Sequence, residues 1–224
     1  MTASLTPAAI KTPRAAGAAG IAFAVLFGIV VALVHSVVPS NPHDAGTWLS
    51  RASNRNEVQL ALGLVPFCGI AFLWFMGAVR SRVGGAEDRF FATVFLGSGL
   101  LFVAMLFVLG AIFGALVSLA AANHGTPPLG VWQLGRVTTF NLTTVFAMRM
   151  AAVFTIAAST IALRAGAHSR VVAVIGFAVG VVLMFAAASL PWLLMAFPAW
   201  VLLVSINLLV LSFRPASSAG APTG

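Results

Sequence analysis

The sequence is short of charged residues, and acidic residues are especially rare. Only 7% of its 224 residues are charged, with four Asp or Glu against twelve Lys or Arg. Hydrophobic residues make up 61% of the chain and the mean hydropathy is +1.07, whereas a soluble domain is about 45–50% apolar. We therefore expect an integral membrane protein. In a soluble protein the net charge of +8 would suggest a nucleic-acid partner, but these charges lie at the ends of apolar segments and are better explained by membrane orientation.

The chain also lacks the residues from which metal centres and common catalytic sites are built. Its single cysteine, Cys68, excludes an intrachain disulfide and a cysteine metal cluster. The histidines share no helical spacing; they are His35, His43, His124 and His168. There is no phosphate loop, dinucleotide fingerprint or nucleophile elbow, and no acid lies within an apolar segment. We therefore expect no metal, no cofactor and no enzymatic activity.

Six apolar segments are long enough to cross a bilayer, which predicts an all-α polytopic membrane protein with six transmembrane helices. These segments are 16–38, 58–79, 90–121, 139–163, 171–188 and 192–213. Together they form one predicted transmembrane domain, 16–213, between disordered tails at 1–15 and 214–224. The first segment is too long for the apolar part of a secretory signal and lacks a small-x-small cleavage site, so we expect it to be retained.

The basic residues that flank these segments are unevenly distributed between the two sides of the membrane. One side has Lys11, Arg14, Arg80, Arg82, Arg89, Arg164, Arg170 and Arg214, and the other has Arg51, Arg55 and Arg136. The positive-inside rule therefore predicts that both termini lie in the cytoplasm. In this topology the outer membrane–water interface contains three tryptophans, Trp48, Trp132 and Trp192.

Two polar connections are predicted on the outer side, at 40–57 and 122–138. In the first, Pro42 and Asp44 are suited to open a short helix that leads into the second span. The second contains the segment LGVWQLGRV, which we expect to lie flat on the outer surface as a short helix.

Arg149 lies near the middle of the predicted span 139–163. Because an arginine at mid-bilayer costs on the order of 3 kcal/mol to insert, we expect the other helices to enclose it. Its guanidinium should point towards the outer leaflet. Candidate partners are Asn141, His35, Asn207 and the loop carboxylates of Asp44 and Glu57. Arg149 is interpreted either as a structural contact or as a site for an anionic ligand or lipid headgroup.

Small residues recur every fourth position on three predicted spans and indicate close helix packing. They are Gly20, Ala24, Gly28 and Ala32 in the first span, Gly110 and Gly114 in the third, and Gly176 and Gly180 in the fifth. Such stripes are also suited to seat another membrane protein or a second copy of the chain.

The second and third spans read FLWFMGAVRSRVGG followed by EDRFFATVFLGSGLLF. This stretch resembles a widespread group of uncharacterised multi-pass membrane proteins from high-GC bacteria. The resemblance implies a six-helix protein of the bacterial inner (plasma) membrane and carries over no functional residue.

Three classes of function remain open from the sequence. The first hypothesis is a non-catalytic accessory or assembly subunit that binds another membrane protein or a membrane lipid. The rival is a small carrier or channel for an anionic or amphipathic solute with Arg149 as its charge anchor, which Pro66 and Pro198 within spans favour modestly. A membrane enzyme ranks last because no acid–base or metal set converges.

Overall fold

Long apolar runs interrupted only by short polar stretches fold into helices, and the computed structural model describes residues 12–83, 89–164, 170–186 and 191–213. Its elements are α1 (Thr12–Val37), η1 (Thr47–Ser50), α2 (Ala52–Val83), α3 (Arg89–Ala122), α4 (Leu129–Asn141), η3 (Leu142–Ala147), α5 (Met148–Arg164), α6 (Arg170–Ala186), η4 (Pro191–Met195) and α7 (Ala196–Phe213). No strand occurs in these ranges, so the predicted all-α class is confirmed. The predicted tails fall outside the described residues, except that α1 already begins at Thr12.

Five helical stretches are long and apolar enough to cross a membrane: Gly17–Val37, Ala52–Ser81, Arg89–Ala122, Leu129–Arg164 and Leu193–Val210. A shorter apolar helix, α6, has 17 residues. The unusually long helix predicted from 90–121 is confirmed as α3, which has 34 residues. Each of the six predicted spans therefore corresponds to an apolar helix, but the helices differ greatly in length.

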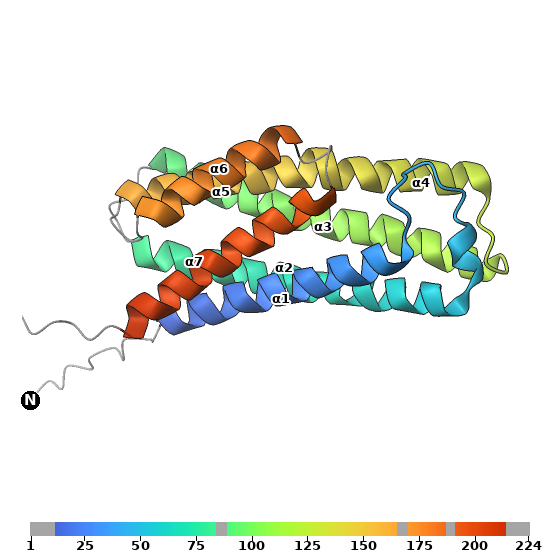
Figure 1. Ribbon diagram of the computed structural model, residues 1–224, viewed down its shortest axis with the longest axis horizontal. Helices are drawn as coiled ribbons and strands as arrows, with labels where there is room; N and C mark the ends of the chain where they lie inside the picture. The colour runs from blue at the N-terminus through green and yellow to red at the C-terminus, as the bar shows by residue number, and fades with distance from the viewer. Residues whose placement is uncertain (1–11, 84–88, 165–169, 187–190, 214–224) are drawn as a thin grey trace, which may run out of the picture.

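The helices form a ring in which α1 packs on α2, α2 on α3, α3 on α5, α5 on α6, and α7 back on α1 (Figure 1). At 1.5 Å per residue, α6 and α7 are about 26 and 27 Å long, whereas α3 is about 51 Å long. As a result, α6 and α7 cover only one half of the bundle (Figure 1). We call the other half the α4 end; it contains α4, the loop 38–51, the start of α2 and the end of α3.

Phenylalanines from five helices form the main core on the side of the bundle that α6 and α7 cover. The ring of Phe72 in α2 lies 5.0–5.7 Å from those of Phe23, Phe102, Phe154 and Phe197. All five side chains are fully buried. Tilted and edge-on ring contacts of this kind stabilise a bundle even where the surroundings are themselves apolar.

A second, smaller core stabilises the α4 end, where Trp132 is fully buried. Its ring lies 5.9 Å from that of Trp48 and 6.3 Å from that of Phe113. The prediction of a flat surface helix with Trp132 at the interface is therefore wrong. Instead α4 runs through η3 into α5 as one continuous helical stretch, Leu129–Arg164, and packs on α3.

Three predicted packing glycines allow helices to approach closely. A Cβ atom on Gly20 would lie 1.9 Å from the Oγ of Ser205, and one on Gly176 would lie 2.0 Å from the Oγ of Ser159. A Cβ on Gly180 would lie 2.5 Å from a side-chain carbon of α5. These positions hold α7 against α1 and α6 against α5, so they agree with the packing prediction.

The other small residues contribute less to packing. Gly28 has no neighbouring atom within 4 Å of an added Cβ, and Ala32 is exposed, whereas Ala24 is buried. Added Cβ atoms on Gly110 and Gly114 would make ordinary contacts at 3.6 and 3.8 Å. The first stripe therefore packs through its Gly20 half only, because α7 crosses α1 there and not farther along.

Candidate ligand cavity

The side chain of Arg149 is exposed, and none of the described helices encloses it. Its Nη1 donates a hydrogen bond to the carbonyl of Val145 on its own helix, at 2.9 Å. Met148 and Ala151 are buried against the bundle, whereas Phe146, one turn before Arg149 on the same face, is exposed, so Arg149 lies on an outward face. The expectation that companion helices surround this guanidinium is therefore wrong.

The predicted partners of Arg149 lie apart from it. Asn141 is exposed, and the Oδ1 of Asn207 is buried in α7 without a hydrogen bond. Glu57 accepts a hydrogen bond from the Oγ of Ser36 at 2.7 Å. Of the four predicted ligand-binding residues (Arg149, Asn141, His35 and Asn207), only His35 lines a described cavity.

A different arginine, Arg136 of α4, forms a buried ion pair in the described part of the chain. Only 8% of Arg136 is exposed. Its Nε lies 3.2 Å from Oδ2 of Asp44, and its Nη2 donates to the carbonyl of Pro39 at 2.7 Å. Sequence reasoning placed Arg136 on the surface. The available signal was its spacing of four residues from Trp132, which puts both side chains on one helix face.

Asp44 attaches the loop 38–51 to α4. Its Oδ1 accepts hydrogen bonds from the backbone N–H of Gly46 at 2.8 Å and from Nε1 of Trp48 at 3.2 Å. Its own carbonyl accepts one from Nε1 of Trp132 at 2.8 Å. Gly46 has φ +71° and a Cβ there would lie 2.8 Å from the Trp132 ring, so glycine is required. The short helix predicted before the second span is present as η1, but its N-cap is Gly46 and not Asp44. Asp44 anchors the loop to α4.

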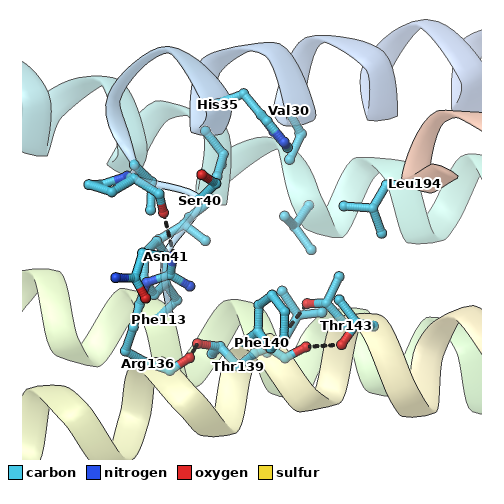
Figure 2. Close-up of a pocket in the computed structure, with 17 residues that line it drawn as sticks. Val30, His35, Ser40, Asn41, Phe113, Arg136, Thr139, Phe140, Thr143 and Leu194 are labelled. Carbon is cyan, nitrogen blue, oxygen red and sulfur yellow. Dashed lines mark hydrogen bonds between the residues drawn. The ribbon is translucent and has the colours of Figure 1, made fainter. Parts of the chain in front are cut away.

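A cavity of about 470 Å³ lies next to this anchored loop, between α1, α2 and α3 on one side and α4 with η3 on the other. We call it the α1–α4 cavity. Figure 2 shows Ser40, Asn41 and Arg136 at one end and Leu194, from η4, at the other. Among the described residues, Leu194 is the only one of η4 and α7 that lines this cavity. In the described residues no extensive contact joins α1 to α4 or η3.

Free hydrogen-bond donors gather at one end of the α1–α4 cavity. Arg136 uses its Nε and Nη2, but its Nη1 has no partner among the described residues. Asn41 accepts a hydrogen bond at Oδ1 from the backbone of His43, which leaves its Nδ2 available, and the Oγ of Ser40 makes none of the described hydrogen bonds. Since Asp44 already balances the charge of Arg136, this end suits a polar head that accepts hydrogen bonds.

The remaining walls are mainly apolar, and the threonines among them are satisfied by their own helix. The hydroxyls of Thr139, Thr143 and Thr144 donate to carbonyls four residues earlier, at 2.8–2.9 Å. The segment η3 beside them is a π-helix, a conformation that is rare and frequent at functional sites. Because their donors are already used, these side chains can border an apolar molecule.

A second chamber of about 130 Å³ adjoins the cavity and extends towards the main core. The two spaces share Val30, Val34, His35, Val65, Leu109, Thr143 and Leu194 in their walls. We call the second space the inner chamber. An arrangement with a polar end and an apolar interior is suited to non-covalent binding of an amphipathic molecule.

Comparison with known proteins adds no assignment. No protein-family model, no curated protein and no solved structure matches the chain. The resemblance to multi-pass membrane proteins of high-GC bacteria stays a prediction, and the function is inferred from the geometry of the cavity.

Proposed function

We propose that the chain is a six-span integral membrane protein, with both termini in the cytoplasm, that binds a lipid-like amphipathic molecule in the α1–α4 cavity. One observation supports this proposal most. The cavity has free hydrogen-bond donors at one end and apolar walls along the rest of its length. Amphipathic molecules have the same separation of polar and apolar parts. In this proposal the protein is non-catalytic. It corresponds to the first hypothesis from the sequence, a subunit without enzymatic activity that binds a membrane lipid.

The expected position in the membrane supports this function. Four of the arginines expected on the cytoplasmic side lie together at one end of the bundle. They are Arg80, Arg89, Arg164 and Arg170, at the ends of α2, α3, α5 and α6. A hydrocarbon core about 30 Å thick corresponds to about 20 helical residues, so a core that starts at Arg164 ends near Thr144. Arg136, two turns farther, then lies among or just beyond the headgroups. The cavity thus has its polar end in the headgroup layer and its apolar end in hydrocarbon.

The same placement explains the exposure of Arg149. This residue lies about 8 Å inside the outer edge of the core, at 1.5 Å per residue. Its guanidinium turns towards that edge, since it bonds the carbonyl of Val145. A long arginine side chain in this position reaches the headgroups and avoids most of the insertion cost. Arg149 then fixes the depth of the helix in the membrane and is not part of the cavity.

Entry of the ligand is proposed to be lateral, from the outer leaflet. The cavity reaches the surface of the bundle, because His35, Ser40 and Asn41 are both exposed and part of its lining. Among the described residues, η4 and α7 contribute only Leu194 to the lining, and no extensive contact joins α1 to α4. A lipid-like molecule would therefore enter the cavity between α1 and α4 directly from the membrane.

Replacement of Leu109 by tryptophan should fill the cavity and displace the bound molecule. Leu109 lines both spaces, and the larger side chain occupies the volume that the ligand needs. We expect the fraction of protein that retains lipid through mild detergent purification, measured by native mass spectrometry, to fall about tenfold. The control is Val108→Trp, which introduces the same side chain at a position that is 48% exposed.

A second comparison separates the cavity from the site predicted around Arg149. Arg149→Leu should retain lipid like the unaltered protein, because its side chain lies outside the cavity. Equal retention in Leu109→Trp and Val108→Trp, or loss in Arg149→Leu alone, would contradict binding in the cavity.

The π-helical segment η3 favours a second candidate, a carrier for the same amphipathic molecule. Helices with irregular turns beside a cavity are common where membrane proteins move a ligand. A carrier would increase the rate at which a fluorescent amphiphile crosses vesicle membranes, and a protein that only binds would not.

A further inference from the structure

We infer that the α1–α4 cavity and the inner chamber form one tunnel for a single-chain amphiphile, and that the floor of the inner chamber selects the length of the chain. This inference rests on the proposed function and adds to it the class of ligand. It follows from the continuity of the two spaces, from the distribution of polar groups and from the size of the inner chamber.

The lining residues follow one another along the helices from the polar end to the inner end. On α1 they run from His35 through Val31 to Phe27, and on α3 from Phe113 through Leu109 to Leu106. Eight residues of α1 correspond to a length of about 12 Å. The two spaces are therefore successive parts of one elongated passage along α1.

Neither the threonine nor the histidine that lines the inner chamber offers it a free hydrogen-bond donor. The hydroxyl of Thr143 donates to the carbonyl of Thr139 at 2.8 Å. One ring nitrogen of His35, at the edge of the chamber, lies 3.1 Å from the carbonyl of Val31. An apolar space of this kind stays dry and accepts hydrocarbon. A bound amphiphile consequently has its head near Arg136 and its chain in the inner chamber.

The size of the inner chamber favours one chain over two. Its volume of about 130 Å³ is close to the roughly 150 Å³ of an engineered cavity that holds a single benzene molecule. One hydrocarbon chain fits such a space, whereas two chains side by side do not. Diacyl lipids would therefore have to leave one chain outside, between α1 and α4.

A closed floor ends the passage. Phe27, Cys68 and Leu106 form it, and all three are buried. The ring of Phe27 lies 5.5 Å from that of Phe23 and 6.5 Å from that of Phe102, so the main core supports it. Because such a core resists displacement, a chain that is too long meets a fixed obstacle, and one that is too short leaves a void.

Changing the depth of the chamber should change the preferred chain length. Val31→Phe adds bulk inside the chamber, and Leu106→Ala deepens its floor. Ala32→Phe is the matched control, because Ala32 is the next residue of α1 and is exposed. The probes are lysophosphatidylcholines with lauroyl, palmitoyl or stearoyl chains, which compete for the protein in native mass spectrometry.

We expect Val31→Phe to lower the ratio of bound palmitoyl to lauroyl probe by about tenfold, and Leu106→Ala to raise the ratio of stearoyl to palmitoyl probe by a similar factor. Ala32→Phe should match the unaltered protein. An unchanged order of chain lengths in both cavity variants, or no binding of any probe, would overturn the single-chain tunnel. The proposed function fails separately, if the unaltered protein retains no membrane lipid at all.

Discussion

Replacement of Asp44 by alanine is expected to lower the free energy of unfolding by about 3 kcal/mol, because it leaves the buried guanidinium of Arg136 without its counter-charge. The carboxylate also accepts hydrogen bonds from Gly46 and Trp48, and both donors would lose their partner. The loop 38–51 should then detach from α4. Unfolding in a detergent–denaturant titration, followed by tryptophan fluorescence, measures the change.

Two further variants distinguish the ion pair from a general effect of losing an acid. Glu57→Ala removes a half-buried carboxylate whose single hydrogen bond, from Ser36, lies at the surface, and it should cost no more than about 1 kcal/mol. The double change Asp44→Leu with Arg136→Met removes both charges together and should recover much of the loss. Equal destabilisation by Asp44→Ala and Glu57→Ala, or a double variant no more stable than the single one, would show that the pair contributes little.

Leucine at Gly176 is expected to destabilise the bundle by about 3 kcal/mol, at the upper end of the cost of overpacking. The added Cβ would lie 2.0 Å from Oγ of Ser159 and 2.7 Å from Nε1 of Trp200. The serine hydroxyl can rotate away. Trp200 has little freedom, because its ring lies 6.5 Å from that of Phe197, to which it is stacked, within the main core. Hence α6 would have to separate from α5 and α7.

The control for this variant has the opposite expected sign. Gly97 of α3 has no atom within 4 Å of an added Cβ, and leucine is the better helix former by about 0.8 kcal/mol. Gly97→Leu should therefore leave the bundle as stable as before or slightly more stable in the same titration. If Gly176→Leu behaves like Gly97→Leu, the close approach of α6 to α5 is not needed for stability.

The sequence predicts the helices well because a membrane-spanning helix requires a long run of apolar residues. The segment 90–121 nearly coincides with α3, Arg89–Ala122. Boundaries are less accurate where a helix continues beyond its apolar part. α2 begins at Ala52, six residues before the predicted span 58–79, because hydropathy reports the apolar portion of a helix and not its full extent.

The arrangement of the α4 end could not be predicted, since it depends on contacts between residues far apart in the chain. The hydrogen bonds from Trp132 and Arg136 to Asp44 connect positions 88 and 92 residues apart. An amphipathic segment such as 129–141 is equally compatible with a membrane surface and with burial in a bundle. Only the loop 38–51, folded over it, decides between the two.

The arginine that the bundle buries could not be predicted, for a related reason. The cost of inserting an arginine was assigned to Arg149, on the assumption that its span starts at residue 139. The helical stretch in fact starts at Leu129 and packs Trp132 and Arg136 into the bundle, so Arg136 is buried, whereas Arg149 lies on an exposed face. Of the two helices that cover only one half of the bundle, only α6 had a short predicted span, 171–188, whereas 192–213 is as long as 58–79.

The central claim, that an amphipathic molecule occupies the α1–α4 cavity, is tested most directly by an electron cryomicroscopy map of the protein in discs of its native membrane lipids. We expect elongated density from beside Arg136 past Leu109 to Phe27. A map in which α1 closes onto α4 and no density separates them would contradict ligand binding in the cavity.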